Sequence, residues 1–134
     1  MKVTTFDFKE FGDDRGTLVS LEGNKNIPFD IKRVYYMFGT KPGISRGFHA
    51  HEKLKQVLVC VKGKCKLLLN NGKGEREVVE LDRPNKGLYL EHNIWREIYD
   101  FTEDAVLMVL ASEHYDESDY IRNYADFLKY VEEN

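Results

Sequence analysis

Hydrophobic residues in this chain fall into short runs, and clusters of glycine, proline, asparagine and aspartate separate these runs. Short runs rich in β-branched and aromatic side chains between such turn signals predict β-strands. The predicted strands cover residues 17–21, 31–38, 55–61, 65–69, 77–81, 87–90, 95–101 and 105–111. The run at 105–111 is apolar almost without interruption, which is typical of a strand buried on both faces.

Turn signals connect these strands. Residues 3–22 alternate partially and contain a turn at Asp13-Asp-Arg-Gly16, so we expect an N-terminal hairpin there. The sequence Asn70-Asn-Gly-Lys-Gly74 is typical of a tight hairpin turn, because Asn-Gly tolerates positive φ. Strands and turns at this regular spacing favour an antiparallel sandwich or barrel.

The pattern changes after Glu113, where apolar residues recur at helical spacing. These residues are Tyr120, Ile121, Tyr124, Phe127, Leu128 and Val131. Asp116 or Ser118 could cap the start of the helix that they predict. We therefore expect an all-β fold with one C-terminal α-helix, in a single domain that covers residues 1–134.

Composition narrows the function classes. A net charge of −3 with scattered Lys and Arg provides no basic surface for nucleic acid or for a membrane. No apolar run is long enough for a membrane span, and the N-terminal residues lack a signal-peptide core. Cys60 and Cys65 show no disulfide or metal spacing, so we expect reduced thiols in a cytoplasmic protein.

The segment Arg46-Gly-Phe-His-Ala-His51 carries the clearest candidate chemistry. Residues i and i+2 of a strand share a face, so His49 and His51 would present two imidazoles to one place. Imidazole transfers protons near neutral pH and also binds metals. The pattern alone leaves three interpretations open, namely proton transfer, metal binding and two polar surface residues.

Other side chains could line a ligand site inside a small β-barrel, where ligands often bind. The candidates for substrate binding are Arg33, Tyr35, Arg46, Gln56, Trp95 and Arg96, and Tyr36 is an alternative to Tyr35. We expect His92 and His114 to be structural or exposed, because each stands alone in the sequence.

The spacing from Gly43 through His49, His51 and Gln56 to Gly63 resembles the first motif of the cupin superfamily. That resemblance implies a cupin-type antiparallel sandwich, or jelly roll. Metal-binding cupins carry a glutamate where this chain has Gln56, and the expected histidine of their second motif falls at Trp95-Arg96. A guanidinium offers no lone pair to a metal, so we expect no metal and no cofactor.

The resemblance is closer to the dTDP-4-dehydro-6-deoxyglucose 3,4-ketoisomerases. It rests on Ile27-Pro-Phe29, Lys32-Arg-Val-Tyr-Tyr36, Arg46–His51, Gln56-Val-Leu-Val-Cys60, Gly87-Leu-Tyr89, Trp95, Val109-Leu-Ala-Ser112 and Tyr115-Asp-Glu-Ser-Asp-Tyr-Ile-Arg-Asn-Tyr124. It implies conversion of dTDP-4-dehydro-6-deoxyglucose to a dTDP-3-dehydro-6-deoxyhexose for cell-surface glycans such as lipopolysaccharide or an S-layer glycan. It also implies a homodimer with exchanged N-terminal strands and no metal in catalysis.

The resemblance and the i, i+2 geometry together suggest roles for the site residues. His49 would be the base at C3, His51 would shuttle protons, and Tyr36 would donate to an oxyanion, with Tyr35 taking this role if the register is shifted. Arg33, Arg46 and Arg15 would bind the diphosphate or the sugar. Arg15 and Arg96 would influence which face of C4 is reprotonated, and the galacto or gluco configuration of the product stays open.

Three rival functions remain at this point. A dTDP-sugar 3,5-epimerase would use a base in the same kind of barrel. A non-catalytic sugar-nucleotide-binding cupin, or one domain of a larger fusion, would bind the ligand without turnover. A metal-dependent, dioxygenase-like cupin would require metal ligands that this sequence does not supply in the usual pattern.

Overall fold

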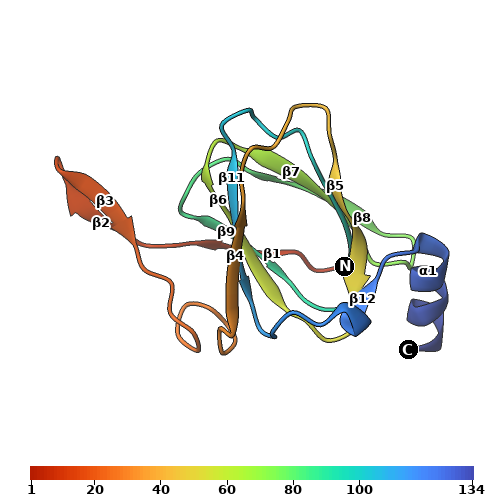
Figure 1. Cartoon of the computed structure of the whole chain (residues 1–134). Coiled ribbons are helices and arrows are strands. Elements are labelled where there is room, and N and C mark those ends of the chain that lie inside the picture. The colour runs from red at the N-terminus through yellow and green to blue at the C-terminus, as the bar shows by residue number, and fades with distance from the viewer.

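The computed structural model describes residues 1–134, and almost all of its regular structure is β-strand (Figure 1). The strands are β1 (Thr4–Asp7), β2 (Glu10–Asp13), β3 (Gly16–Val19), β4 (Arg33–Met37), β5 (Arg46–His51), β6 (Gln56–Lys62), β7 (Cys65–Asn70), β8 (Arg76–Leu81), β9 (Lys86–Leu90), β10 (Trp95–Tyr99), β11 (Val106–Ala111) and β12 (Tyr120–Ile121). A short 3₁₀ helix, η1 (Glu117–Asp119), precedes β12, and helix α1 (Tyr124–Glu133) follows it.

Two five-stranded antiparallel sheets face each other. Their strand orders are β1-β9-β6-β11-β4 and β12-β5-β10-β7-β8, and β2 pairs only with β3 in a separate hairpin. Figure 1 shows this hairpin projecting away from the sandwich, whereas α1 lies beside the second sheet. The prediction of a cupin-type all-β fold with one C-terminal helix is confirmed.

The main core fills the space between the two sheets. It comprises Leu58, Cys60, Cys65, Leu67, Leu69, Val79, Leu81, Leu88, Leu90, Ile98, Phe101, Ala105, Leu107 and Val109. Both cysteines are free thiols in this core, as the sequence predicts. Since alternate residues of each strand point inward, the same strands present their other residues to the outer faces.

Each sheet is also covered on part of its outer face. Phe8, Ile27 and Phe29 pack against residues of β6 and β11 on the first sheet. This cover explains the continuous apolar run of β11, which is buried on both faces as predicted. On the second sheet, Phe127 and Val131 of α1 pack against Ala50 and Trp95.

The predicted helix start requires a correction. Asp116 caps η1 and not α1, because its side chain accepts a hydrogen bond from the Ser118 N–H. Tyr120 and Ile121 are extended and pair with His51 and Ala50 at the edge of β5. The α-helix starts at Tyr124, after its N-cap Asn123. Pairing with an open sheet edge therefore outweighs the helical spacing of two residues.

The single α-helix, α1, is too short to cross a membrane. It stabilises the sandwich as an amphipathic cover, since Phe127 and Val131 are buried on one side while its acidic residues remain exposed. Its packing also fixes Trp95, whose ring lies 5.7 Å from the ring of Phe127. The helix thus supports β10 from outside, opposite the face that lines the interior.

Candidate functional site

The histidine pair lies on β5 as the sequence predicts. The ring centroids of His49 and His51 are 4.9 Å apart, and the ring planes are almost perpendicular at 89°. The ring of Tyr120 contacts both, with centroid distances of 5.0 Å to His49 and 4.3 Å to His51. Because β12 pairs with β5, the chain brings Tyr120 over the histidines from 69 positions beyond His51 in the sequence.

A β-bulge in β5 sets the direction of His49. The pairing with β10 shifts between Arg96 opposite His49 and Glu97 opposite Gly47. Gly47 and Phe48 both have positive φ, 91° and 56°. Positive φ is uncommon for phenylalanine, and bulges with such strain occur often beside functional sites. A Cβ on Gly47 would lie 3.0 Å from the Arg96 carbonyl, so glycine suits this position.

Hydrogen bonds define the tautomer of each histidine. His49 Nδ1 lies 3.1 Å from the Gly47 carbonyl oxygen, which can only accept, so Nδ1 carries the hydrogen. His51 Nδ1 lies 3.1 Å from Oδ2 of Asp119, a carboxylate oxygen that accepts hydrogen bonds, so Nδ1 of this ring also carries the hydrogen. In both rings Nε2 keeps its lone pair, and the buried Nε2 of His51 has no protein partner.

Both rings are neutral near pH 7. Burial, followed by the positive charge of Arg96, lowers the pKa of His49 to about 4. The same two causes lower the pKa of His51. The contact between His51 and Asp119 is therefore a hydrogen bond from a neutral ring to a carboxylate, and not an ion pair. A neutral imidazole is the form that can accept a proton.

A buried arginine lies next to this pair. The Arg96 side chain is only 2% exposed, and Nε and Nη2 donate to the Ile94 carbonyl at 3.3 and 3.2 Å. Its Nη1 donates to Oε1 of Gln56, and Gln56 Nε2 donates to the Tyr35 hydroxyl at 2.9 Å. Burial lowers the pKa of Arg96 to about 10, so it remains charged at neutral pH.

These contacts answer whether the site could hold a metal. Gln56 stands where the cupin motif has a carboxylate ligand, and its amide is already bonded to Arg96 and Tyr35. A buried guanidinium next to the histidines would repel a cation. No group of three or more His, Cys, Asp or Glu side chains is placed to bind a metal. The residues present do not fit a metal centre.

These groups border a cavity of about 340 Å³ between the sheets. It is lined by Arg33, Tyr35, Met37, Arg46, Gly47, His49, Gln56, Leu58, Arg96, Ile98, Val109, Tyr115, Tyr120 and Arg122. Four of these side chains are arginines, whereas no acidic side chain lines the cavity. The site can therefore accept an anionic ligand and place it beside a neutral base.

The cavity contains six of the predicted site residues, and these are Arg33, Tyr35, Arg46, His49, Gln56 and Arg96. Buried His51 lies directly behind His49 without lining it. Sequence reasoning missed Tyr115, Tyr120 and Arg122. Tyr120 and Arg122 belong to the segment that the spacing assigned to the helix, and Tyr115 immediately precedes its predicted cap. Long-range pairing of β12 with β5 brings this segment to the site.

Three predicted site residues lie elsewhere in this chain. Tyr36 is 64% exposed and points away from the cavity, so Tyr35 takes its predicted place. Adjacent residues of a strand face opposite sides, which explains why only one of the two tyrosines can face inward. Arg15 is at the tip of the β2–β3 hairpin, 87% exposed and paired with Asp13. Trp95 belongs to the packing under α1.

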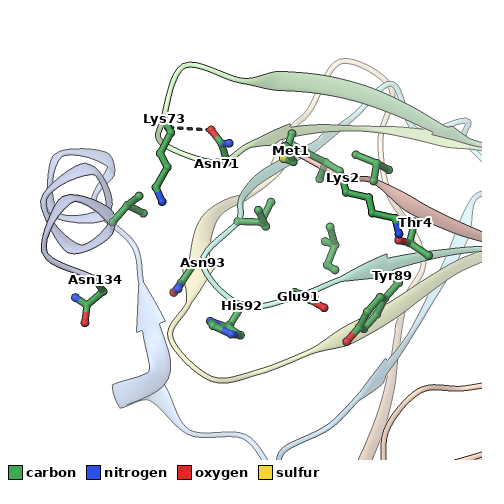
Figure 2. Close-up of a pocket in the computed structure, with 15 residues that line it drawn as sticks. Met1, Lys2, Thr4, Asn71, Lys73, Tyr89, Glu91, His92, Asn93 and Asn134 are labelled. Carbon is green, nitrogen blue, oxygen red and sulfur yellow. Dashed lines mark hydrogen bonds between the residues drawn. The ribbon is translucent and has the colours of Figure 1, made fainter.

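A second and larger cavity, of about 450 Å³, lies beside the N-terminal residues and the connection between β9 and β10 (Figure 2). Its polar lining includes Lys2, Lys73, Glu91 and His92, and the view shows these side chains set apart around it. His92 is exposed, as the sequence predicts. The hydrogen bond between the polar groups drawn joins the Lys73 N–H to Asn71 Oδ1 at 2.8 Å. This cavity has volume without convergent reactive groups.

Comparison with known proteins settles the family. The FdtA family, described as WxcM-like, C-terminal, matches residues 1–132. This chain belongs to that family. A relative from Aneurinibacillus thermoaerophilus, named TDP-4-oxo-6-deoxy-alpha-D-glucose-3,4-oxoisomerase, is 53% identical over 131 residues, which are 98% of this chain and 94% of the relative. The resemblance to the 3,4-ketoisomerases seen in the sequence is confirmed.

Solved structures agree with this assignment. A 3,4-ketoisomerase from Helicobacter canadensis matches with a TM-score of 0.95 and 45% identity, covering 98% of both chains. A mutant of the 3,4-ketoisomerase QdtA from Thermoanaerobacterium thermosaccharolyticum, in complex with TDP-4-keto-6-deoxyglucose, matches with a TM-score of 0.95 and 46% identity. That match covers 98% of this chain and 95% of the mutant's chain.

Proposed function

We propose that this protein is a TDP-sugar 3,4-ketoisomerase, an isomerase that converts TDP-4-keto-6-deoxyglucose to a TDP-3-keto-6-deoxyhexose. The observation that carries the proposal is 53% identity, over nearly the whole chain, to a relative named for this activity. The cavity supports it chemically, since it combines a neutral imidazole, a buried guanidinium and further arginines. An isomerase that moves a ketone needs such a base and such a cation.

The reaction begins at C3, whose proton is acidified by the neighbouring C4 carbonyl. His49 Nε2 takes this proton, and the C–H electron pair forms the C3–C4 double bond of an enediolate with negative charge on O4. The O3 hydroxyl proton then passes to O4, an electron pair on O3 forms the new C3 carbonyl, and the electron pair of the double bond takes a proton at C4. No redox cofactor is required, because C3 and C4 exchange oxidation levels.

Arg96 and Tyr35 are assigned to the charge that develops on oxygen. A buried guanidinium stabilises an enediolate strongly, because little water competes for it. Gln56 joins Arg96 to the Tyr35 hydroxyl and so orients both groups toward one place. Burial raises the pKa of Tyr35, so its hydroxyl keeps its proton and can donate it to an oxygen of the sugar.

We assign the diphosphate to the arginines at the mouth of the cavity. Arg33 is the strongest candidate, because its buried Nε has no protein partner and is free to donate. Its guanidinium is stacked over Tyr35 at 5.0 Å and near Tyr115 at 5.6 Å, which restricts its orientation. Arg46 is exposed at the same mouth. Guanidinium groups bind phosphate oxygens with two parallel hydrogen bonds.

The decisive experiment is incubation with TDP-4-keto-6-deoxyglucose in D₂O, followed by proton NMR of the product. A ketoisomerase gives a carbonyl at C3 and deuterium at C4. A 3,5-epimerase would keep the carbonyl at C4 and introduce deuterium at C3 and C5. Binding of TDP without any change in the sugar would indicate a non-catalytic module, and either of these two results would refute the proposal.

The proposed assembly is a homodimer in which N-terminal strands exchange. The β2–β3 hairpin supports it, because an isolated two-stranded hairpin is marginally stable and this one exposes Phe11 and Leu18. The edge strand β4 is complementary, with exposed Val34 and Tyr36 and unpaired backbone groups. Light scattering should give twice the chain mass of 15.7 kDa, and a monomer would refute the exchange.

We also propose the cellular context that the family implies. The enzyme would act in the cytoplasm, where sugar nucleotides are made, and its product would feed lipopolysaccharide or S-layer glycan synthesis. Loss of the protein should then remove one deoxyhexose derivative from the cell-surface glycan. Mass spectrometry of that glycan from a deletion strain checks this expectation, and an unchanged glycan would contradict it.

A further inference from the structure

Asp119 connects the histidine pair to the rest of the fold. Its Oδ2 accepts from His51 Nδ1 at 3.1 Å, and its Oδ1 accepts the Lys53 N–H at 2.8 Å. Oδ2 also accepts the Leu54 N–H at 3.3 Å, and the Asp119 carbonyl accepts the Glu52 N–H at 3.0 Å. The carboxylate is therefore held by two backbone donors on one side and by the imidazole on the other.

The contact with His51 goes beyond what this turn requires. Backbone donors alone would satisfy a carboxylate that only fastened η1 to the turn after β5. Instead, one oxygen is shared with a ring that is 1% exposed and whose opposite nitrogen has no protein partner. A buried polar atom without a hydrogen-bond partner lowers the stability of the fold. In enzymes such atoms often belong to catalytic or ligand-binding groups.

We propose that Asp119 is a positioning residue for proton transfer, because it fixes the His51 ring with Nδ1 protonated and leaves its Nε2 lone pair open beside His49. The inference rests on the proposed function and deepens it. When His49 holds the C3 proton, the site contains two cations, the imidazolium and Arg96. Asp119 then supplies the nearby negative charge, and its effect already reaches Arg96, whose protonated form it favours.

The variant Asp119→Asn separates positioning from simple anchoring. An asparagine of the same shape has only one oxygen, so it cannot accept from both Lys53 and His51. If the oxygen stays with the Lys53 N–H, the amide NH₂ faces His51 and forces Nδ1 to accept. The hydrogen of His51 then moves to Nε2, and the open lone pair is lost. Such tautomer errors have large effects where a carboxylate orients a catalytic histidine.

The test combines nitrogen NMR of the histidine rings with kinetics. In the wild-type protein, long-range ¹H–¹⁵N spectra should show His51 with its hydrogen on Nδ1. In Asp119→Asn the hydrogen should move to Nε2, and kcat should fall about 10²- to 10⁴-fold with TDP affinity within about twofold of wild type. Asp116→Asn is the matched control, since it removes one charge from the same turn and keeps an oxygen for the cap.

Two results would overturn the inference. One is a wild-type His51 with its hydrogen on Nε2, which needs no variant and is decisive even if Asp119→Asn fails to fold. The other is a folded Asp119→Asn with kcat within about twofold of wild type. Failure of the proposed function is a separate result, because then the wild-type protein would convert no TDP-4-keto sugar while the tautomer measurement still stands alone.

Discussion

The two cavities of this protein differ in volume and in the reactive side chains that line them. The larger, at about 450 Å³, is lined by apolar residues and by exposed polar side chains such as Lys2, Lys73 and His92. The smaller, at about 340 Å³, brings an imidazole, three tyrosine rings and four arginines into one space. Volume alone would favour the larger cavity as the active site. The smaller cavity is favoured by side chains that converge on one place and have shifted pKa values.

Burial accounts for the difference between the histidines of the two cavities. His49 is mostly buried beside a buried cation, so its pKa falls to about 4 and it stays neutral. His92 is exposed at the rim of the other cavity and makes no hydrogen bond through its ring. The same side chain thus becomes a candidate base only where neighbouring elements exclude water and fix its orientation. The following experiments test that contrast.

The largest effect is expected for His49→Asn. Removal of the base should lower kcat by about 10³-fold or more, while TDP binding stays intact because the arginines remain. His92→Asn is the matched control in the other cavity and should change kcat less than twofold. Turnover by NMR and TDP affinity by calorimetry measure both. Equal losses in the two variants would remove the distinction between the cavities.

A smaller loss is expected for Tyr35→Phe. The hydroxyl accepts from Gln56 and borders the cavity, so its removal should lower kcat about 10- to 100-fold with little change in KM. Tyr36→Phe removes the same atom one residue along β4 and should leave kcat within about twofold. If Tyr36→Phe were the more damaging change, the sequence assignment of Tyr36 would be right and the structural correction wrong.

Arg33→Ala should act on binding and not on the chemical step. Loss of one charged donor to the diphosphate should raise KM about tenfold, or about 1.4 kcal/mol, with kcat nearly constant. Lys73→Ala removes a cation from the rim of the larger cavity and should have no effect on KM. Steady-state kinetics compare the two variants. A KM increase in Lys73→Ala alone would indicate that the diphosphate binds in the larger cavity and would contradict the assignment to Arg33.

The smallest effect concerns pH. His49 must be neutral to act, and its lowered pKa of about 4 keeps it neutral well below pH 7. The value of kcat/KM should therefore fall by only about 10% between pH 7 and pH 5, and steeply below about pH 4. For an unperturbed histidine with a pKa near 6.5, kcat/KM would fall about 25-fold between pH 7 and pH 5. A decrease in kcat/KM centred near pH 6.5 would show that His49 is more exposed to solvent than the structure indicates.

The stability of the folded protein should also decrease as the pH is lowered. The pKa of His49 is lower in the folded than in the unfolded chain, so the unfolded state binds more protons between about pH 6.5 and pH 4. The free energy of unfolding should decrease as pH falls through that window. Chemical denaturation at several pH values measures the slope, and His49→Asn should reduce it. An unchanged slope would assign the loss of stability to other groups.

Local patterns were sufficient for much of the fold. The runs that became β4, β6, β7, β8, β9, β10 and β11 were recognisable because β-branched and aromatic residues lie between clear turn signals. The pairing of His49 with His51 followed from the period of a strand. Gln56 and Arg96 argued against a metal site because the cupin motif places them at ligand positions that their chemistry does not suit. These inferences need only neighbours in sequence and the properties of single side chains.

The rest depended on contacts between distant segments. Tyr120 and Ile121 share helical spacing with α1, yet they pair with β5 because its edge is open. That pairing brings Asp119 into contact with His51 and places Tyr120 against the rings of both histidines. No local sequence pattern predicts these contacts. The bulge at Gly47 and Phe48, and the choice of Tyr35 over Tyr36, likewise follow from register, and register is decided by whole sheets.

The sequence by itself determined the kind of protein, because family motifs, strand periods and ligand chemistry are written in short stretches of residues. Only the tertiary structure decided which side chains act together, how each imidazole holds its hydrogen and which cavity is chemically equipped. The physical reason is that pKa values, tautomers and charge stabilisation depend on burial and on partners from other strands. Those properties come into existence only when the two sheets close around the site.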